Sequence, residues 1–566
     1  MLNAQKLYCD YLIGIDELLT GVGLRDARVM ELHHLISNAE LLVPVIGAFS
    51  AGKSTLINSF LSSSLLPVDI TPETALATEL HFGENERIEA VDADQSIDTY
   101  PLSTMDSVKA KAAQYRYIRV FLNNSHLKSI QPLVLVDMPG FDSPLDLHNQ
   151  SILQYISKGA HYMVLTSVEE GGLTRSMNRQ IAEVYDVNKG ISFFLSKANL
   201  RAPSEVEEIR KKIVSQLMEQ FETPHAVIPV GLSGGTDLQR VIESIDPEKL
   251  MEKLFKDFVL DTCGLCKADL NTRVSALKKN KNENDEALRE IKNGLVDLVH
   301  KKEAMLYEAR EKYAGVRVGR VVERVGQELS NSVEELVNTA LSSGSDAFAK
   351  SVSEMVRGTL LHEIRVSMEE INTQVISDFS FELKYLDGVL SSYENGDMTW
   401  LDRTISSTNH LLHSGVDKLG QLGVGLAGKG GMIAKTLATI IGITTNIVAP
   451  IVELVIIFLP EIISWLISKS KEQQQREKIR TSILTGTIPS VKSKLRAELP
   501  EIFNTQVQTL IHQIGDQFEG RIKEMQLLIE ATQSDKEEKS RAIEEQLMMY
   551  SSVIEQLNER TNAILN

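Results

Sequence analysis

The stretch from Val43 to Leu56 reads V-P-V-I-G-A-F-S-A-G-K-S-T-L, and Gly47–Ser54 within it match the pattern G-x-x-x-x-G-K-[ST]. This is the pattern of a phosphate-binding loop, in which main-chain N–H groups surround a phosphate at the start of a helix. The apolar run Leu41–Ile46 predicts the preceding strand, and a helical pattern follows. Lys53 would give a positive charge to the outer phosphates, and Ser54 a hydroxyl to Mg2+. A chance match is the alternative, but both flanking elements are present.

The chain has 566 residues, more than one hydrophobic core accommodates, so we expect two or more domains or one globular domain with an extended helical part. Hydrophobic residues make up 43% and charged residues 24%, as in ordinary folded proteins. The formal net charge of -18 argues against general attraction to nucleic acid or to an anionic membrane. The sequence has no extended basic and aromatic surface, and we expect no nucleic-acid partner.

Cysteine usage and the start of the chain indicate the compartment. Cys9, Cys263 and Cys266 are too few for a disulfide framework, which is typical of a reducing environment. Cys263 and Cys266 have the spacing of a metal or redox pair, but no second pair accompanies them, so two small apolar residues on one helix face is the simpler interpretation. The first twenty residues lack the features of a secretory signal. We therefore expect a cytoplasmic protein.

From Leu41 to about Ile245, short apolar runs alternate with amphipathic stretches. This alternation predicts a layered α/β domain with a mostly parallel sheet and helices on both faces. After the strand that precedes the phosphate loop, five further strands are expected, and a turn at Asn123 and Asn124 should join the first two of them. These strands are Tyr117–Leu122, Leu133–Val136, Tyr162–Val168, Ile191–Leu195 and Val227–Val230.

The rest of the chain is predicted to be helical. No proline occurs between Pro247 and Pro450, and strand-like runs largely disappear. Apolar residues repeat at spacings of three and four in Leu288–Leu298, Leu361–Val375 and Ile543–Leu557. Such seams are more typical of the interior of a helical bundle than of a partner-binding zipper. The sequence therefore predicts an all-α stalk of long antiparallel helices.

We divide the chain into five parts. Residues 1–40 form an N-terminal helix that packs in a neck bundle, with a helix from the far end of the chain as its partner. Residues 41–245 form the nucleotide domain, and residues 246–412 a helical neck and trunk. Residues 413–470 form a glycine-rich and hydrophobic tip, and residues 471–566 the returning helices.

The tip combines seven glycines in Gly415–Gly431 with an apolar region, Met432–Ile467. Thr436–Val452 would make about 25 Å of helix, short of the roughly 30 Å hydrocarbon core of a bilayer. Extending the helix through Glu453 is unfavourable because a charge at mid-membrane costs roughly 2.5 to 3.5 kcal/mol. A hairpin that enters one leaflet fits better, and the alternative is a buried hairpin of the bundle. The expected membrane-contacting residues are Ile440, Ile441, Ile447, Val448, Ile456, Ile457, Phe458 and Trp465.

Further motifs must identify the nucleotide, because a phosphate loop serves ATPases and GTPases alike. Thr74, or alternatively Thr71, lies about twenty residues after Lys53, where a switch loop would place a threonine on Mg2+. Either threonine can instead be an ordinary turn residue. Asp137 and Gly140 end an apolar strand in the sequence D-M-P-G. The carboxylate can hold the hydration shell of Mg2+, while the Gly140 N–H contacts the last phosphate.

The base-reading residues are expected at two later strand ends. Ser196-Lys197-Ala-Asn199 follows one strand, where a guanine-reading motif belongs. Ser233 lies in V-G-L-S-G-G after the next strand and is placed to contact the base. This second signal is weak when taken alone.

Together these motifs resemble the dynamin superfamily of large GTPases, with the strongest likeness to bacterial dynamin-like proteins and the mitofusin branch. The motif match covers roughly residues 41 to 235, and the remainder agrees in layout only. The resemblance implies a membrane-remodelling protein that uses GTP, GDP and Mg2+. It also implies homodimers that pair through the GTPase domains, possible higher oligomers or related partners, and peripheral membrane association through the tip.

The resemblance assigns roles to individual residues. Lys53 would bind phosphate, Ser54, Thr74 and Asp137 would hold Mg2+, and Ser50 would help to position the attacking water. The implied catalytic residues are Ser50, Lys53 and Thr74. The implied nucleotide-binding residues are Gly47, Ala48, Phe49, Ser50, Ala51, Gly52, Lys53, Ser54, Thr55, Asp137, Gly140, Ser196, Lys197, Asn199 and Ser233.

Two residues depart from the family pattern. Asn199 stands where the family has an aspartate that accepts two hydrogen bonds from guanine, and an amide offers one acceptor and an unwanted donor. Phe49 stands where dynamins often carry glutamine, and it cannot polarise a water. Guanine selectivity and turnover are therefore expected to be reduced. The alternatives are a slow or inactive nucleotide-gated helical scaffold and an ATPase with relaxed base specificity.

Overall fold

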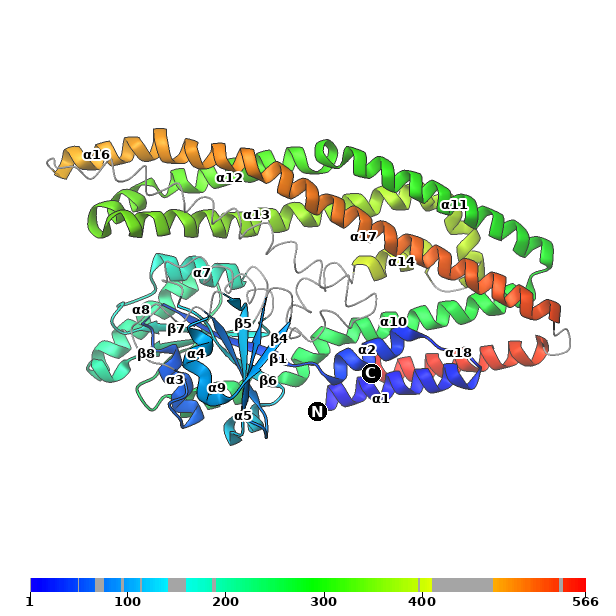
Figure 1. The fold of residues 1–566 in the computed structure, drawn as a ribbon, viewed down its shortest axis with the longest axis horizontal. Coiled ribbons are helices and arrows are strands. Elements are labelled where there is room, and N and C mark those ends of the chain that lie inside the picture. Colours follow the sequence, from blue (N-terminus) through cyan, green and yellow to red (C-terminus); the bar gives the residue numbers. More distant parts are fainter. Residues whose placement is uncertain are drawn as a thin grey trace.

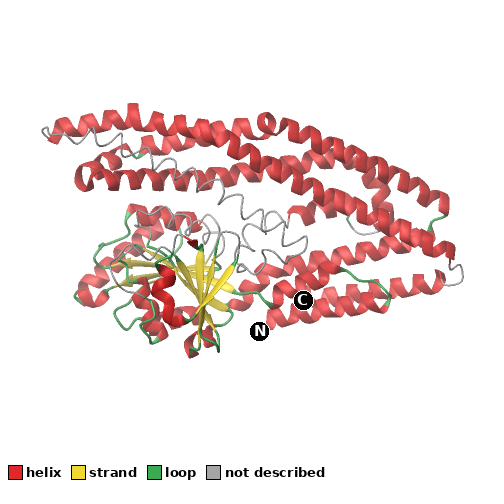
Figure 2. Cartoon of the chain, in the orientation of Figure 1, coloured by secondary structure: helices red, strands yellow, loops and turns green. Residues whose placement is uncertain are grey.

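A computed structural model describes residues 2–48, 50–66, 76–92, 96–111, 114–140, 159–185, 190–394, 398–409, 472–538 and 543–565 (Figure 1). An α/β domain contains all of the described strands, and two groups of helices extend from it. Figure 2 shows this division, with the strands confined to one end of the molecule.

One mixed sheet forms the centre of the α/β domain, with the described strands in the order β4-β3-β5-β2-β6-β1-β7-β8-β9. Its strands are β1 (Leu41–Gly47), β2 (Ala77–Phe82), β3 (Arg87–Val91), β4 (Ile97–Tyr100), β5 (Tyr117–Leu122), β6 (Leu133–Asp137), β7 (His161–Ser167), β8 (Gly190–Ser196) and β9 (Val227–Pro229). Strands β6, β1, β7, β8 and β9 are all parallel to one another. The mostly parallel sheet is confirmed, but β2 runs antiparallel to β6, and β3 runs antiparallel to β4 and β5.

Helices cover both faces of the sheet, as the sequence predicts. Residues of α3, α5 and α9 contribute to one apolar cluster, and those of α7 and α8 to the cluster on the other face. The helices of this domain are α3 (Lys53–Leu61), α4 (Met105–Lys109), α5 (Ser125–Ile130), α7 (Arg175–Tyr185), α8 (Pro203–Phe221) and α9 (Gly235–Ser244), with 3-10 turns η1 (Leu102–Thr104) and η3 (Ala198–Leu200).

The expected turn at Asn123 and Asn124 is wrong. The Asn124 side chain accepts hydrogen bonds from the backbone N–H groups of His126 and Leu127 and so caps α5. The strands before and after α5 are not neighbours either, because β2 lies between them in the sheet. An asparagine favours a helix N-cap as readily as a turn, and the sequence pattern does not separate the two.

A buried group of charges explains why β2 escapes detection from the sequence. The His81 side chain is 5% exposed, and its ring nitrogens lie 3.3 Å from Glu40 and 3.2 Å from Glu79. Glu79 is 1% exposed and also pairs with Arg119 at 3.2 Å. The His81 ring stacks on Phe121 with centroids 5.0 Å apart. These polar residues interrupt the apolar run expected of a buried strand, although the ion pairs make their burial acceptable.

This group predicts a pH-dependent stability. Burial opposes the charged imidazole, but Glu40 and Glu79 outweigh it and raise the pKa of His81 from 6.5 to about 9. The stabilisation is therefore complete below the unfolded pKa and is lost as the pH rises through about 9. We expect His81→Gln to lose roughly 2 to 4 kcal/mol at pH 6, and less at pH 10. Urea unfolding midpoints of both proteins across this range test it, and parallel curves would contradict it.

The helices outside the α/β domain form two groups (Figure 1). The short bundle contains α1 (Asn3–Gly21), α2 (Ala27–Ser37), α10 (Pro247–Lys278) and α18 (Ile543–Leu565). The long bundle contains α11 (Lys281–Glu308), α12 (Val316–Asn331), α13 (Val333–Glu394), α14 (Trp400–Asn409), α16 (Glu472–Ser482) and α17 (Ile488–Glu538), with π-helical turns η4 (Ala309–Gly315) and η6 (Ile483–Thr487). Residues 1–40 hold two helices rather than the expected one, because the chain breaks after Gly21 and Asp26 caps α2.

The two bundles have different cores. The apolar residues of the short bundle belong to the same cluster as α3 and α9 of the α/β domain. In this cluster α1 and α18 meet, and the Tyr11 hydroxyl lies 3.0 Å from Thr561 Oγ1. Apart from Ala276 on α10, the core of the long bundle is built from the long-bundle segments alone. None of the described helices combines the length and the apolar character that crossing a membrane requires.

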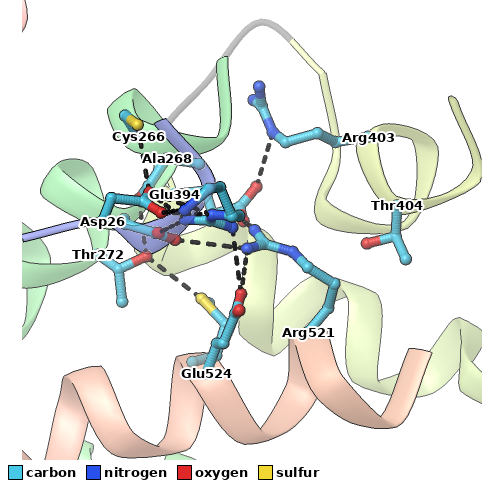
Figure 3. A network of polar contacts seen from close by, with 12 residues as sticks. Asp26, Cys266, Ala268, Thr272, Glu394, Arg403, Thr404, Arg521 and Glu524 are labelled. Atoms are coloured by element: carbon cyan, nitrogen blue, oxygen red, sulfur yellow. Dashed lines mark hydrogen bonds and ion pairs between the residues drawn. The ribbon is translucent and has the colours of Figure 1, made fainter. Parts of the chain in front are cut away.

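A buried network of ion pairs joins the two bundles, and we call it the junction network (Figure 3). Glu394, at the end of α13, is fully buried and pairs with Arg403 at 3.1 Å and with Arg521 at 3.5 Å. Burial raises the pKa of the Glu394 carboxyl, and the two arginines oppose this effect. Arg521, on α17, also pairs with Asp269 of α10 at 3.5 Å. The network extends to α2 through Arg28, which lies 2.5 Å from Asp269.

Candidate nucleotide-binding site

The phosphate loop connects β1 to α3 in the geometry that its motif requires. Every residue of β1 is buried, and the strand lies between β6 and β7. A side chain at Gly47 would meet the Leu165 carbonyl oxygen at 2.4 Å, so only glycine allows this close strand contact. Gly52, which caps α3, has a φ of 85°, a conformation that glycine adopts without strain. The loop therefore leads directly into the N-terminus of α3.

Lys53 points into the loop. Its side chain is 5% exposed, and Nζ donates hydrogen bonds to the carbonyl oxygens of Gly47 at 3.1 Å and Ala48 at 2.9 Å. The ammonium is thus held where the main-chain N–H groups at the start of α3 also converge. Both the positive charge and the helix N-terminus favour an anion at this point.

Ser54 and Asp137 lie in direct contact beside Lys53. The Ser54 hydroxyl donates to Asp137 Oδ2 at 2.8 Å, which brings residues 83 positions apart in the sequence together. Asp137 Oδ1 is buried and has no hydrogen-bond partner among the described residues. Burial raises the pKa of the Asp137 carboxyl, and Lys53, Ser54 and Lys109 oppose this effect. A hydroxyl beside a buried carboxylate with a free oxygen is a donor set that fits Mg2+.

Lys109 was not expected from the sequence. It ends α4, and its electrostatic partners are Asp137 and Asp106, which oppose the lowering of its pKa by burial. No motif surrounds Lys109, and its approach to Asp137 depends on the packing of α4, whose Met105 and Val108 belong to the same apolar cluster as α3. It adds a second positive charge near the carboxylate that Lys53 already faces.

The expected base-reading loop is tied to the phosphate loop. The Ser196 hydroxyl donates to the Ala51 carbonyl oxygen at 2.5 Å and to the Thr166 carbonyl oxygen at 3.2 Å. Lys197 has a left-handed conformation, with a φ of 57°, and its ammonium pairs with Glu169. Glu169 was also missed, although a carboxylate two residues after the end of the buried strand β7 was a usable signal.

Asn199 and Ser233 have exposed side chains on two adjacent loops. The Ala198 N–H donates to the Val230 carbonyl oxygen at 3.1 Å, which joins these loops. A side chain at Gly235 would come within 2.5 Å of the backbone of Ser59 and Phe60, so this glycine allows α9 to pack against α3. The amide of Asn199 and the hydroxyl of Ser233 are thus both open to an incoming ligand.

The structure therefore brings many of the candidate residues to one edge of the sheet. Gly47, Ala48, Ala51 and Gly52 form the loop, Ser50 is exposed at its turn, and Thr55 follows Ser54 on α3. Gly140 is buried three residues after Asp137. Other candidates lie outside the described residues. These are Phe49, Thr71, Thr74 and the membrane-contacting set Ile440, Ile441, Ile447, Val448, Ile456, Ile457, Phe458 and Trp465.

Comparison with known proteins agrees with the motifs. A sequence model of the dynamin family matches residues 43–198. Over 187 residues the chain is 27% identical to the bacterial dynamin-like protein of Nostoc punctiforme, a match that covers 29% of this chain and 27% of that protein. Over 170 residues it is 24% identical to dynamin-like protein A of Bacillus subtilis, covering 28% and 14% of the two chains. The chain thus spans well under half the length of these curated relatives.

A solved structure of an oligomerised bacterial dynamin pair matches 94% of this chain and 91% of its own chain at 13% identity, with a TM-score of 0.31. That score is too low to equate the two arrangements of helices. The resemblance expected from the motifs is confirmed by the family match to the α/β domain. The chain therefore resembles the dynamin superfamily, and residues 43–198, which carry the phosphate loop and Asp137, are the part that matches it.

Proposed function

We propose that this chain is a dynamin-like GTPase that couples GTP binding and hydrolysis to membrane binding or remodelling. The observation that carries the enzymatic part is the convergence of Lys53, Ser54 and Asp137 at the N-terminus of α3. A triphosphate needs positive charge, main-chain donors and a divalent cation held by oxygen ligands, and this site supplies the residues for all three. The family match over the same residues supports the choice of nucleotide chemistry.

The mechanism follows from what each residue does in the site. The loop between Gly47 and Lys53 binds the phosphates through backbone N–H groups, and Lys53 compensates the charge that develops on the outer phosphate oxygens. Ser54 and Asp137 would hold Mg2+, which supplies charge neutralisation between the outer phosphates. Thr74 is proposed as a further Mg2+ ligand. Ser50 is proposed to position the attacking water at the exposed turn of the loop.

Selectivity for the base depends on the side chain at Asn199, and a substitution there tests it. We expect Asn199→Asp to raise GTP affinity relative to ATP by about ten-fold, because a carboxylate accepts two charge-assisted hydrogen bonds from guanine. Displacement of a fluorescent nucleotide by GTP and by ATP measures the ratio. Asn123→Asp, on an exposed loop after β5, is the matched control. A preference for ATP in both the native protein and Asn199→Asp would favour the ATPase alternative.

We propose that the lipid contact is made by Met432–Ile467, whose apolar composition supports it. Pairing of two GTPase domains and assembly with further copies or related partners are proposed from the family resemblance. A cytoplasmic, peripherally membrane-associated location is proposed on the same ground.

The double substitution Ile456→Asp and Ile457→Asp tests the lipid contact. It is expected to weaken liposome co-sedimentation by more than about ten-fold, since each charge opposes insertion. Phe381→Asp, at a 79% exposed position on α13, is the control. Unchanged sedimentation of the tip variant would refute the membrane part alone.

A further inference from the structure

The far end of the long bundle lies against the α/β domain. Figure 1 shows α13 beside α7, and Glu335 in the first turn of α13, before the non-helical break at Gly344, contacts α7. Arg179 of α7 donates through Nη2 to both carboxylate oxygens of Glu335, each at 3.0 Å. The two side chains are 21% and 16% exposed, so the pair is half-buried. This ion pair connects two parts of the chain that are 156 residues apart.

The contact is polar on both sides. The apolar residues of α7, including Met177 and Ile181, pack toward the sheet. Those at the start of α13, including Leu336 and Val337, pack into the long bundle. The apolar cluster that contains the α7 residues and the apolar core of the long bundle therefore remain separate at this contact. Interfaces of this kind between parts of one chain permit relative movement, since little apolar surface is exposed when they separate.

A cavity next to the ion pair shows that the two surfaces are incompletely packed. It has a volume of about 390 Å3, and Arg179 and Ala182 of α7 line one side. The other side is formed by α12 and α13, with polar residues that include Asn331 and Thr359. A gap of this size accommodates water molecules, so close packing does not hold the two surfaces together here.

A short connection links this contact to the base-reading loop. The segment between β7 and α7 begins with Val168, whose N–H donates to the Ser196 carbonyl oxygen at 3.1 Å. The next residue, Glu169, holds the ammonium of Lys197. The segment then passes through Gly171, with a φ of 64°, into α7 and reaches Arg179 within its second turn. A displacement of α7 therefore acts on residues that contact the base-reading loop.

We infer that the contact between Arg179 and Glu335 is an autoinhibitory clasp that holds the end of the long bundle on α7 and so restrains the base-reading loop. The clasp has a further connection on the side of the long bundle. Glu334, the neighbour of Glu335, pairs with Arg476 at 3.1 Å and with Arg480 at 3.3 Å. Both arginines belong to α16, which begins five residues after Ile467 in the sequence, so the clasp is connected along the chain to the segment proposed to bind lipid. The inference rests on the proposed function only for its hydrolysis measurement.

Reversing the charges tests the clasp. Arg179→Glu and Glu335→Arg each place like charges in contact, and like charges at an interface repel. We expect each single variant to raise the ratio of separated to clasped molecules by more than about ten-fold and to accelerate GTP hydrolysis. The double variant restores the attraction and should return both properties toward the native values. Arg496→Glu is the matched control. Arg496 pairs with Glu323, and both residues belong to helices of the long bundle, so this charge reversal leaves the contact with α7 unchanged.

Distance measurements between two spin labels by double electron–electron resonance give the ratio of separated to clasped molecules directly. Spin labels at Ser204→Cys on α8 and Ser343→Cys on α13 occupy exposed positions, whereas Cys9, Cys263 and Cys266 are buried. Longer distances in the single variants and recovery in the double variant support the clasp. Native distances in both single variants overturn it, and longer distances without faster hydrolysis overturn its inhibitory role. If no variant hydrolyses GTP, the proposed function fails and the distances alone decide whether the clasp exists.

Discussion

Lys53→Ala is expected to reduce GTP hydrolysis by at least about a hundred-fold. The ammonium is held within the loop by the carbonyl oxygens of Gly47 and Ala48, so it is already in position before phosphate arrives. Losing one such preorganised charge removes stabilisation that grows as charge develops in the transition state, and single groups of this kind contribute about 100- to 1,000-fold. Phosphate release under saturating GTP and Mg2+ measures the effect.

One further variant and one further measurement make this result interpretable. Lys211→Ala changes a lysine whose side chain is 72% exposed on α8, and it should keep the native rate. Thermal unfolding of Lys53→Ala shows whether the loss of hydrolysis reflects unfolding. A folded Lys53→Ala protein with native turnover would mean that hydrolysis takes place elsewhere, or that a contaminating enzyme is responsible.

Glu394→Gln is expected to have the largest effect on stability. The substitution leaves Arg403 and Arg521 without the carboxylate that both contact in a buried position. Removing one member of a buried ion pair typically costs about 3 to 5 kcal/mol, because the remaining charge stays out of water. Urea unfolding followed by far-UV circular dichroism should show a clearly lower midpoint for the helical part.

An exposed ion pair provides the comparison for Glu394→Gln. Glu323 contacts Lys492 and Arg496 at 2.6 Å, but its side chain is 59% exposed. Exposed ion pairs contribute little because water screens them, so Glu323→Gln should unfold at nearly the native midpoint. If the two variants unfold alike, the ion pairs of Glu394 are not the buried, stabilising contacts described above.

The parts of the fold that follow from local patterns were predictable. The phosphate loop is encoded by adjacent residues, and the strand and helix that flank it are recognisable from their own apolar patterns. Asp137 was also predictable because it ends a buried strand. In parallel strands such ends meet at one edge of the sheet, and its contact with Ser54 agrees with this rule.

The parts that depend on tertiary packing were not predictable. Lys109 reaches the site from a segment without a motif. Glu79 and His81 make β2 look like a solvated segment, although their charges are paired inside the protein. The junction network draws one or two charges from each of several helices, and each charge alone resembles an ordinary surface residue. The clasp likewise needs two helices whose proximity no sequence pattern specifies.

The measurement that tests the central claim most directly is equilibrium binding of a fluorescent GTP analogue to the native chain, with Mg2+ present and after its removal by a chelator. The site combines a lysine, a serine hydroxyl and a buried carboxylate with a free oxygen, so we predict saturable binding that weakens by at least about ten-fold when Mg2+ is removed. Unlabelled GTP should displace the analogue. Absence of binding, or binding of equal strength without Mg2+, would contradict the assignment of this site.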